Sequence, residues 1–199
     1  MRVIKTAIEG AVIIEPVLHG DERGFFIETF QQQRYRDLAG IDVTFVQDNI
    51  SRSKKGVIRG LHFQNKRPQG KLAQVVRGEI FDVILDIRPQ SSTFGCWDGV
   101  VLSENNKRQI WIPPGLAHGF MVLSDVADFS YKCSDLYDPA DEACILWSDP
   151  ALAIQWPLQQ LGDIELTVSP RDAQAPTLAE SQRTARQKQL IEQDREFKR

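Results

Sequence analysis

The chain has 199 residues, enough for one domain with a well-buried core and a small appendage, and it carries 24 basic against 27 acidic residues. The net charge of -3 argues against a surface that attracts nucleic acid or anionic membranes by general electrostatics. Any anionic ligand must therefore be held by a few local basic side chains.

The cysteines and the amino terminus indicate a cytoplasmic protein. Cys96, Cys133 and Cys144 are odd in number and lack the C-x-x-C spacing of a zinc or redox site, so we expect reduced, buried thiols. The first residues, Met1 to Lys5, are charged too early for a signal peptide, and no apolar run approaches the ~20 residues of a membrane span. We expect no contact with membranes.

Short runs of valine, isoleucine and phenylalanine, broken by turn residues, extend from Ile4 to about Trp156 and predict an all-β domain. Residues 31–38 are the best candidate for a short internal helix. Residues 75–87 have the pattern of two strands around a tight turn at Arg77-Gly78. The second of these strands alternates in a way that gives one wholly apolar face and one mixed face.

The run Arg59-Gly60-Leu61-His62-Phe63-Gln64 places one of only three histidines among strand-forming residues. A basic side chain and an imidazole on a short, glycine-containing strand suit the wall of a pocket better than a core. Because side chains alternate along a regular strand, Arg59 and His62 point to opposite faces. They can meet one ligand only if Gly60 bends or bulges the strand, or if they serve the pockets of different subunits.

A second motif, P-x-G-x-x-H, spans Pro113 to His118 and follows the apolar strand Ile110-Trp111-Ile112. It is a turn that delivers His118 onto the next strand. With the strand pair around Gly78, it resembles the second motif of the cupin superfamily. That resemblance implies a double-stranded β-helix, a jelly-roll barrel with a few short helices and a ligand at its mouth.

In many cupins the histidine of that motif binds a metal, together with a pair of histidines two residues apart. This chain has no such pair, since no two of His19, His62 and His118 stand two or four residues apart. A triad of His62, His118 and a carboxylate stays geometrically possible, but we expect no metal. Histidine that no metal occupies titrates near neutral pH and suits a general base.

Beyond Pro176 the composition changes to glutamine, arginine, glutamate and lysine. This segment can be helical but has few apolar side chains to bury, so it is either solvated or binds a partner. We therefore divide the chain into a domain of residues 1–178 and a polar, charged tail of residues 179–199.

Several further motifs occur together, in an order that resembles the dTDP-4-dehydrorhamnose 3,5-epimerase family. They are RGLHFQ at 59–64, PQGKL at 68–72, VRGE at 76–79, FDV at 81–83, PPGLAHGF at 113–120, YKCSDLY at 131–137 and SPRD at 169–172. The resemblance covers residues from about 3 to 178 and leaves out only the tail.

The resemblance implies a cofactor-independent isomerase of dTDP-rhamnose or deoxysugar synthesis. Its substrate would be a dTDP-linked 4-keto-6-deoxyhexose, inverted at carbons 3 and 5 through enolates. By similarity, His62 is the base, Asp172 the carboxylate that orients its ring, and Tyr131 the acid on the opposite face. Lys71 would be the charge that stabilises the developing oxyanion.

Other candidates bind the substrate. By the resemblance, these are Arg23, Arg59 and His118 for the phosphates, Glu28, Gln47 and Asn49 for the base and sugar, Phe26 as a stacking face for thymine, and Tyr137, Glu142 and Arg171 as further contacts. In the family the neighbouring subunit supplies part of the pocket, which implies a homodimer. We expect no nucleic acid partner.

Two other functions stay open. A single-site epimerase or a ketoisomerase of a similar nucleotide sugar would share the same His–Asp pair. A non-catalytic cupin that binds a nucleotide sugar or a metal would need no base and acid on opposite faces. Without the resemblance, Asp172 is equally explained as a helix cap or a solvent-exposed residue. The alternatives for Tyr131 and Lys71 are a core residue with a satisfied hydroxyl and a solvated lysine at a strand end.

Overall fold

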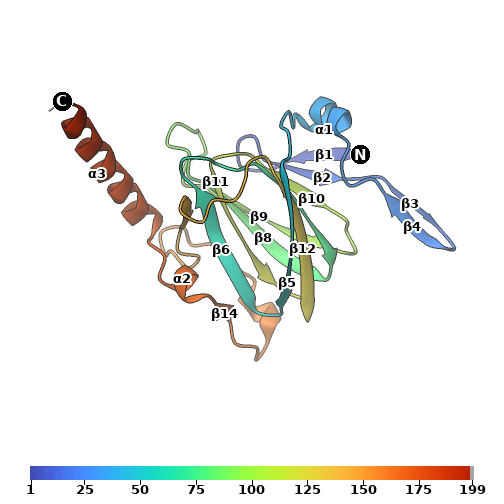
Figure 1. Cartoon of the computed structure of the whole chain (residues 1–199). Coiled ribbons are helices and arrows are strands. Elements are labelled where there is room, and N and C mark those ends of the chain that lie inside the picture. Colours follow the sequence, from blue (N-terminus) through green and yellow to red (C-terminus); the bar gives the residue numbers. More distant parts are fainter. Residues whose placement is uncertain (198–199) are drawn as a thin grey trace.

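The computed structural model describes the backbone of residues 1–197 and the side chains of residues 1–187. Two antiparallel sheets pack face to face, and a β-hairpin and a C-terminal helix extend from opposite sides of them (Figure 1). This arrangement confirms the expected all-β jelly roll with few helices.

The first sheet contains six strands in the order β1 (Arg2–Lys5), β2 (Val12–Glu15), β10 (Gln109–Ile112), β7 (Lys71–Arg77), β12 (Val126–Cys133) and β5 (Gln47–Lys54). The second has the order β13 (Glu142–Cys144), β6 (Val57–Gln64), β11 (Leu116–Val122), β8 (Glu79–Asp86) and β9 (Trp97–Ser103), and β14 (Thr167–Val168) pairs with β6 in parallel. The projecting hairpin is β3 (Leu18–Asp21) and β4 (Gly24–Ile27). The helices are α1 (Gln32–Ala39), the 3-10 turn η1 (Leu158–Leu161), α2 (Pro170–Ala173) and α3 (Leu178–Phe197).

The two strands around Gly78 are present, but they do not form a hairpin. Strand β7 pairs with β10 and β12 in the first sheet, whereas β8 pairs with β9 and β11 in the second. The chain therefore crosses between the sheets at Gly78, where φ is +79° and an added Cβ would lie 2.1 Å from the carbonyl oxygen of Val126. Alternation along a strand reports which faces are buried but not which segments pair, so a hairpin and a crossover look alike in the sequence.

Both faces of β8 are buried, which fixes the second sheet in the middle of the molecule. Ile80 and Ile84 pack into the core between the two sheets. Val83 and Leu85 point the other way, into a second core closed by the segment that includes Trp156. Each fully buried side chain of this size contributes about 1.5–3 kcal/mol. The predicted apolar face of this strand is confirmed.

The predicted internal helix is confirmed as α1. The Gln31 side chain caps its start by accepting a hydrogen bond from the Arg34 amide, and Gly40 ends it in the left-handed conformation. Its buried residue, Tyr35, donates a hydrogen bond to the Gln109 side-chain oxygen at 2.7 Å, which attaches the helix to the first sheet.

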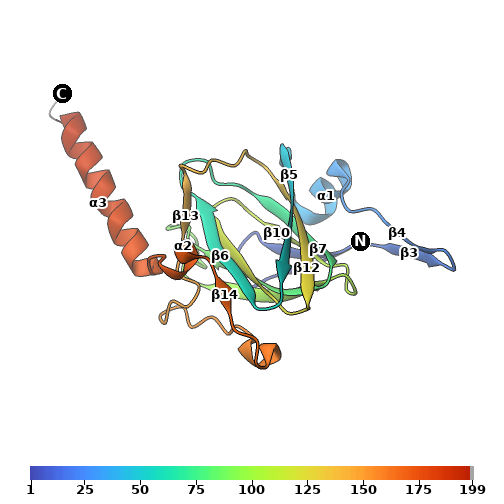
Figure 2. The same cartoon turned by 60° about the horizontal axis from the view of Figure 1, so that its bottom comes forward.

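Helix α3 leaves the domain and runs into open space (Figure 2). At its first residue, Leu178 packs against the second core. In residues 1–197 there is no helix with both the length and the apolar character required to cross a membrane.

Candidate active site

A cavity of about 310 Å³ lies between the two sheets, with β5, β7 and β12 on one wall and β6 and β11 on the other. Many of the predicted site residues line it together. They are Gln47, Asn49, Arg59, His62, Lys71, His118, Tyr131, Tyr137 and Glu142. These side chains come from segments up to 95 positions apart, so the fold alone assembles them.

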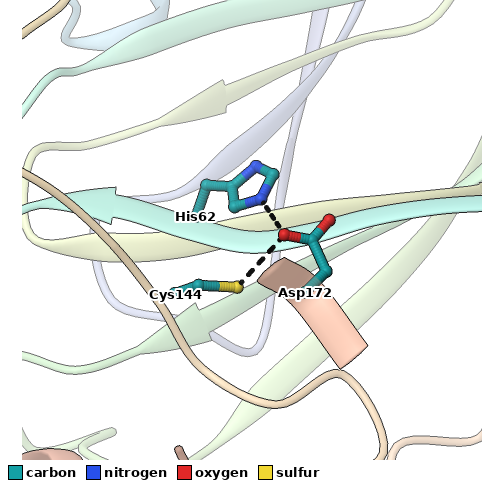
Figure 3. A group of neighbouring side chains, drawn as sticks. All are labelled: His62, Cys144 and Asp172. Carbon is teal, nitrogen blue, oxygen red and sulfur yellow. Dashed lines mark hydrogen bonds and ion pairs between the residues drawn. The ribbon is translucent and has the colours of Figure 1, made fainter. Parts of the chain in front are cut away.

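Asp172 lies behind His62 and is hydrogen-bonded to its ring (Figure 3). Its Oδ1 is 2.8 Å from Nε2 of His62, and its Oδ2 accepts a hydrogen bond from the Gly60 amide at 3.2 Å. Ser169, not Asp172, caps α2, since its hydroxyl accepts from the Asp172 amide. With Nε2 engaged, Nδ1 is the ring nitrogen of His62 that remains to act on a ligand (Figure 3).

The contacts of Asp172 keep it charged although it is only 3% exposed. Burial by itself would raise the pKa of this carboxyl, but the hydrogen bond and charge of His62 and the Gly60 amide outweigh burial and hold the pKa below its ordinary value. An ionised Asp172 fixes the orientation of the ring and stabilises positive charge that develops on it.

Strand β6 bulges at Gly60, so Arg59 and His62 reach the same cavity. His118 of β11 pairs with His62 of β6, and Phe120 of β11 pairs with Arg59 of β6. Between these two pairs β11 advances by two residues and β6 by three, so β6 contains one extra residue, which is a β-bulge. Gly60 has φ +119°, and an added Cβ would lie 2.5 Å from Cα of Gly119. The first of the two predicted explanations, a bend at Gly60, is confirmed.

Gly60→Ala is therefore expected to lower the free energy of unfolding by about 3 kcal/mol, through strain at positive φ and a backbone clash with Gly119. Urea denaturation measures this loss. Gly24→Ala is the matched control, because Gly24 also has a large positive φ, +131°, but nothing lies within 4 Å of its added Cβ. Equal losses in the two variants would show that strain, and not close packing against β11, explains the glycine.

Tyr131 and Lys71 face the cavity from the wall opposite His62, since they lie on β12 and β7 of the first sheet. Burial, with the neighbouring Cys133 and Glu142, raises the pKa of the Tyr131 phenol, which therefore stays protonated and can donate a proton. Burial lowers the pKa of the Lys71 ammonium. A cation in such a poorly solvated position interacts strongly with a nearby anion.

His118 is held by a second carboxylate. Its Nε2 lies 2.8 Å from Oδ2 of Asp82, and its ring stacks on Phe129 with centroids 5.7 Å apart. Asp82 is fully buried, and its Oδ1 finds no hydrogen-bond partner in the described part of the chain. The sequence placed Asp82 only on the mixed face of its strand; its partnership with His118 depends on the pairing of β8 with β11.

Besides Asp172, which lies behind His62, four predicted residues do not line the cavity. Arg23 and Phe26 are on the projecting hairpin, where Arg23 pairs with Asp21 and Phe26 is 69% exposed. Glu28 pairs with Arg34. Arg171 forms an ion pair with Glu142, which also accepts a hydrogen bond from the Tyr137 hydroxyl at 3.0 Å.

Sequence reasoning missed other residues that line the cavity: Ser51, Phe63, Gln64, Gln69, Gly119, Phe120, Phe129 and Cys133. The alternation of side chains along a strand could have identified some of them. Ser51, for example, continues the series of Gln47 and Asn49 on one face of β5. Sequence reasoning also missed Cys144 as a neighbour of the His62–Asp172 pair. Its Sγ lies 3.7 Å from Oδ1 of Asp172, because β13 pairs Cys144 with His62.

Comparison with known proteins gives one consistent result. The family model for dTDP-4-dehydrorhamnose 3,5-epimerase matches residues 5–180. The enzyme of that name from Salmonella typhimurium is 55% identical over 179 residues, which cover 89% of this chain and 96% of the relative. The one from Escherichia coli is 51% identical over 181 residues, covering 90% and 96%.

Solved structures of 3,5-epimerases and of one monoepimerase share this fold. A 3,5-epimerase from Legionella pneumophila in complex with dTDP-4-keto-L-rhamnose is 57% identical, with a TM-score of 0.85 over 89% of this chain and 93% of that one. A Bacillus anthracis dTDP-4-dehydrorhamnose 3,5-epimerase with TDP and PPi bound is 41% identical, with a TM-score of 0.82 over 88% and 98%. A 3'-monoepimerase from Streptomyces bikiniensis in complex with dTDP-quinovose is 38% identical, with a TM-score of 0.84 over 92% and 90%.

Proposed function

The chain belongs to the dTDP-4-dehydrorhamnose 3,5-epimerase family and has that activity in dTDP-rhamnose biosynthesis, and from this premise we propose that the His62–Asp172 pair and Tyr131 carry out its proton transfers. The observation that carries the proposal is that the imidazole and the phenol line one cavity from opposite sheets. Inversion of a carbon needs a base on one face of the enolate and an acid on the other.

In the proposed mechanism, Nδ1 of His62 takes the proton from the carbon beside the ketone. The electron pair of the broken C–H bond moves into the enolate, and the charge of Lys71 stabilises its oxygen. Asp172 stabilises the imidazolium. The Tyr131 hydroxyl then protonates the carbon from the other face, and solvent returns a proton to the phenolate and removes one from His62. The same cycle at the second carbon completes the reaction.

Solvent deuterium tests this assignment. The protein is incubated with the keto sugar in deuterated water with a chelator present, and the positions of deuterium are read by NMR. We expect deuterium at carbons 3 and 5 and activity that the chelator does not abolish. Deuterium at one carbon only would indicate a single-site epimerase, the activity that the Streptomyces bikiniensis relative bears in its name. Loss of activity with chelator would indicate a metal requirement.

For the substrate we propose that Arg59 and His118 bind the diphosphate, and that Gln47 and Asn49 contact the nucleoside and sugar. The Bacillus anthracis relative, solved with TDP and PPi bound, supports a diphosphate site in this fold. Arg59 supplies the planar donors that suit phosphate oxygens. We assign Tyr137, Glu142 and Arg171, which contact one another, to the remaining contacts with substrate.

Lys71→Met is expected to lower kcat by about 10²-fold, the usual cost of removing one group that stabilises an oxyanion. The active form of Lys71 is the charged one, and its pKa is lowered by burial. Activity should therefore fall as the pH rises through a pKa below the ordinary lysine value. A pH profile of kcat/KM measures this alkaline limb, which Lys71→Met should remove. A limb that is unchanged in the variant would assign it to another group.

We propose that the protein is a homodimer in which the β3–β4 hairpin completes the partner's pocket. The hairpin extends away from its own domain (Figure 1). On it, Phe25 is 57% exposed and Phe26 is 69% exposed. Two exposed aromatic side chains on a narrow projection favour burial against another chain. Arg23, on the same hairpin, would then reach the phosphates bound by the partner.

Mixing two inactive variants tests the shared pocket. His62→Ala keeps an intact hairpin, and Arg23→Ala with Phe26→Ala keeps an intact base. In a mixed dimer, the pocket that retains His62 receives the intact hairpin of the other chain. After exchange of equal amounts, we expect recovery of about a quarter of the wild-type activity, because about half of the dimers are mixed and each has one complete site. No recovery after verified exchange would contradict the shared pocket.

We also propose that residues 1–178 form the catalytic domain and that the protein is cytoplasmic. The residues assigned above all lie before position 178, and the family match ends at residue 180. The cysteines are free thiols, as suits a reducing compartment. Cys133 and Cys144 are buried as predicted, whereas the prediction is wrong for Cys96, which is exposed.

A further inference from the structure

Three side chains of metal-binding type meet at the wall of the cavity: the proposed catalytic pair His62 and Asp172, and Cys144, to which the proposed mechanism gives no role. His62, Cys144 and Asp172 each offer one ligand atom, and these atoms all lie within 4.8 Å of one another. Figure 3 shows the ring nitrogen and the thiol converging on the same carboxylate oxygen from two sides. We propose that this cluster is an inhibitory site for Zn²⁺, which binds to Nε2 of His62, Sγ of Cys144 and the Asp172 carboxylate.

The ligand types favour zinc over harder cations. Imidazole nitrogen, thiolate sulfur and carboxylate oxygen are the three kinds of donor that zinc takes in proteins, and three protein ligands leave a fourth position for water. Magnesium and calcium prefer sites made of oxygen. Because one of the three donors is a sulfur and another is a nitrogen, magnesium and calcium are both disfavoured at this site.

The spacing also fits. Zinc bonds of about 2.0–2.3 Å put tetrahedral ligands about 3.3–3.6 Å apart. Asp172 Oδ1 lies 2.8 Å from Nε2 of His62 and 3.7 Å from Sγ of Cys144, so these two separations are within about 0.5 Å of the tetrahedral values. All three donor atoms lie within 4.8 Å of one another.

The scaffold holds these donors without help from a metal. Cys144 and His62 are directly paired residues of neighbouring strands, and the Gly60 amide fixes the second oxygen of Asp172. Such outer contacts orient metal ligands and strengthen binding. Asp172 contributes a negative charge, while burial and then the nearby Asp172 charge raise the pKa of the Cys144 thiol to about 12. The metal must therefore displace the thiol proton, as zinc does at other cysteine sites.

Inhibition follows from the atoms that zinc would occupy, and this step rests on the proposed roles of His62 and Asp172. Zinc on Nε2 withdraws charge from the ring and makes Nδ1 a weaker base, and it uses the carboxylate that would stabilise the imidazolium. The groups assigned to the nucleotide, such as Arg59 and His118, are left free. Zinc should therefore lower kcat and leave KM nearly unchanged.

The test uses the full chain, stripped with chelator and titrated with Zn²⁺ in buffer without thiols. Each variant is compared with its own zinc-free rate. In Cys144→Ser, which keeps the size of the side chain but is a poor zinc ligand, half-inhibition should need at least about tenfold more zinc, the lower range for loss of a supporting contact. Cys96→Ser, which removes an exposed thiol elsewhere, should respond like the wild type. Equal sensitivity of Cys144→Ser and the wild type overturns the proposal.

A second readout does not depend on activity. Co²⁺ replaces zinc at such sites, and its bond to thiolate gives a sulfur-to-metal charge-transfer absorption in the near ultraviolet. We expect this absorption in the wild type and in Cys96→Ser, and its loss in Cys144→Ser. Absence of the band in the wild type refutes the metal site whatever the kinetics. If the band is present while His62→Ala retains full epimerase activity, the metal site stands and the catalytic assignment fails.

Discussion

Replacement of His62 by alanine is expected to lower kcat by about 10⁴-fold, at the upper end of what a general base contributes. His62 is the imidazole in the cavity whose partner, Asp172, is buried and charged. Glu142 is the carboxylate that lines the cavity from the same sheet, but Arg171 and the Tyr137 hydroxyl already bind it. Without His62, neither carbon should exchange its hydrogen with deuterated water. Steady-state kinetics and NMR of the recovered sugar measure the two effects.

Chemical rescue provides the control for this variant. Alanine leaves a space the size of the ring beside Asp172, so imidazole added to the buffer can occupy it and accept the proton. We expect partial recovery of exchange with imidazole and unchanged affinity for TDP, since the nucleotide contacts stay in place. Substantial exchange in His62→Ala without imidazole would show that another group removes the proton.

The sequence was sufficient to predict site residues whose position depends only on the strand that carries them. His62, Lys71, His118 and Tyr131 all line the cavity. Glycine or proline residues lie close to the first three in the sequence, whereas the roles of Lys71 and Tyr131 were predicted only through the family resemblance. Their strands were predictable because period two and turn residues are local signals. The bend at Gly60 was one of the two explanations that the sequence left open for Arg59 and His62, which a regular strand would point to opposite faces.

What the sequence did not reveal depends on strand pairing. Cys144 reaches Asp172 because β13 pairs with β6, and Asp82 reaches His118 because β8 pairs with β11. The partners in each pair are 28 and 36 positions apart, and no local pattern specifies such contacts. The same limit explains why the crossover at Gly78 was taken for a hairpin. The same limit applies between chains. Arg23 and Phe26 lie on the β3–β4 hairpin, and the ligand proposed for them is bound by a partner chain.

Tyr131→Phe is expected to lower the rate of inversion by about 10³-fold while deuterium exchange into the substrate falls far less. Phenylalanine keeps the ring and its packing against Phe129, 5.4 Å away, and removes only the hydroxyl. His62 can still form the enolate, and once its own proton has exchanged with solvent it returns deuterium to the face from which it took hydrogen. The substrate should therefore become labelled without changing configuration.

The ratio of exchange to inversion is what assigns the acid, because a general loss of stability or of substrate binding lowers both rates together. Tyr35→Phe is the matched control: it removes a buried hydroxyl that bonds to Gln109 and Thr29 outside the cavity, so it should cost about 1 kcal/mol of stability and leave the ratio unchanged. If exchange and inversion fall equally in Tyr131→Phe, the phenol is not a dedicated proton donor to the far face. If inversion persists at the wild-type rate, a different donor protonates the far face, and the two-sided arrangement of His62 and Tyr131 does not explain epimerisation.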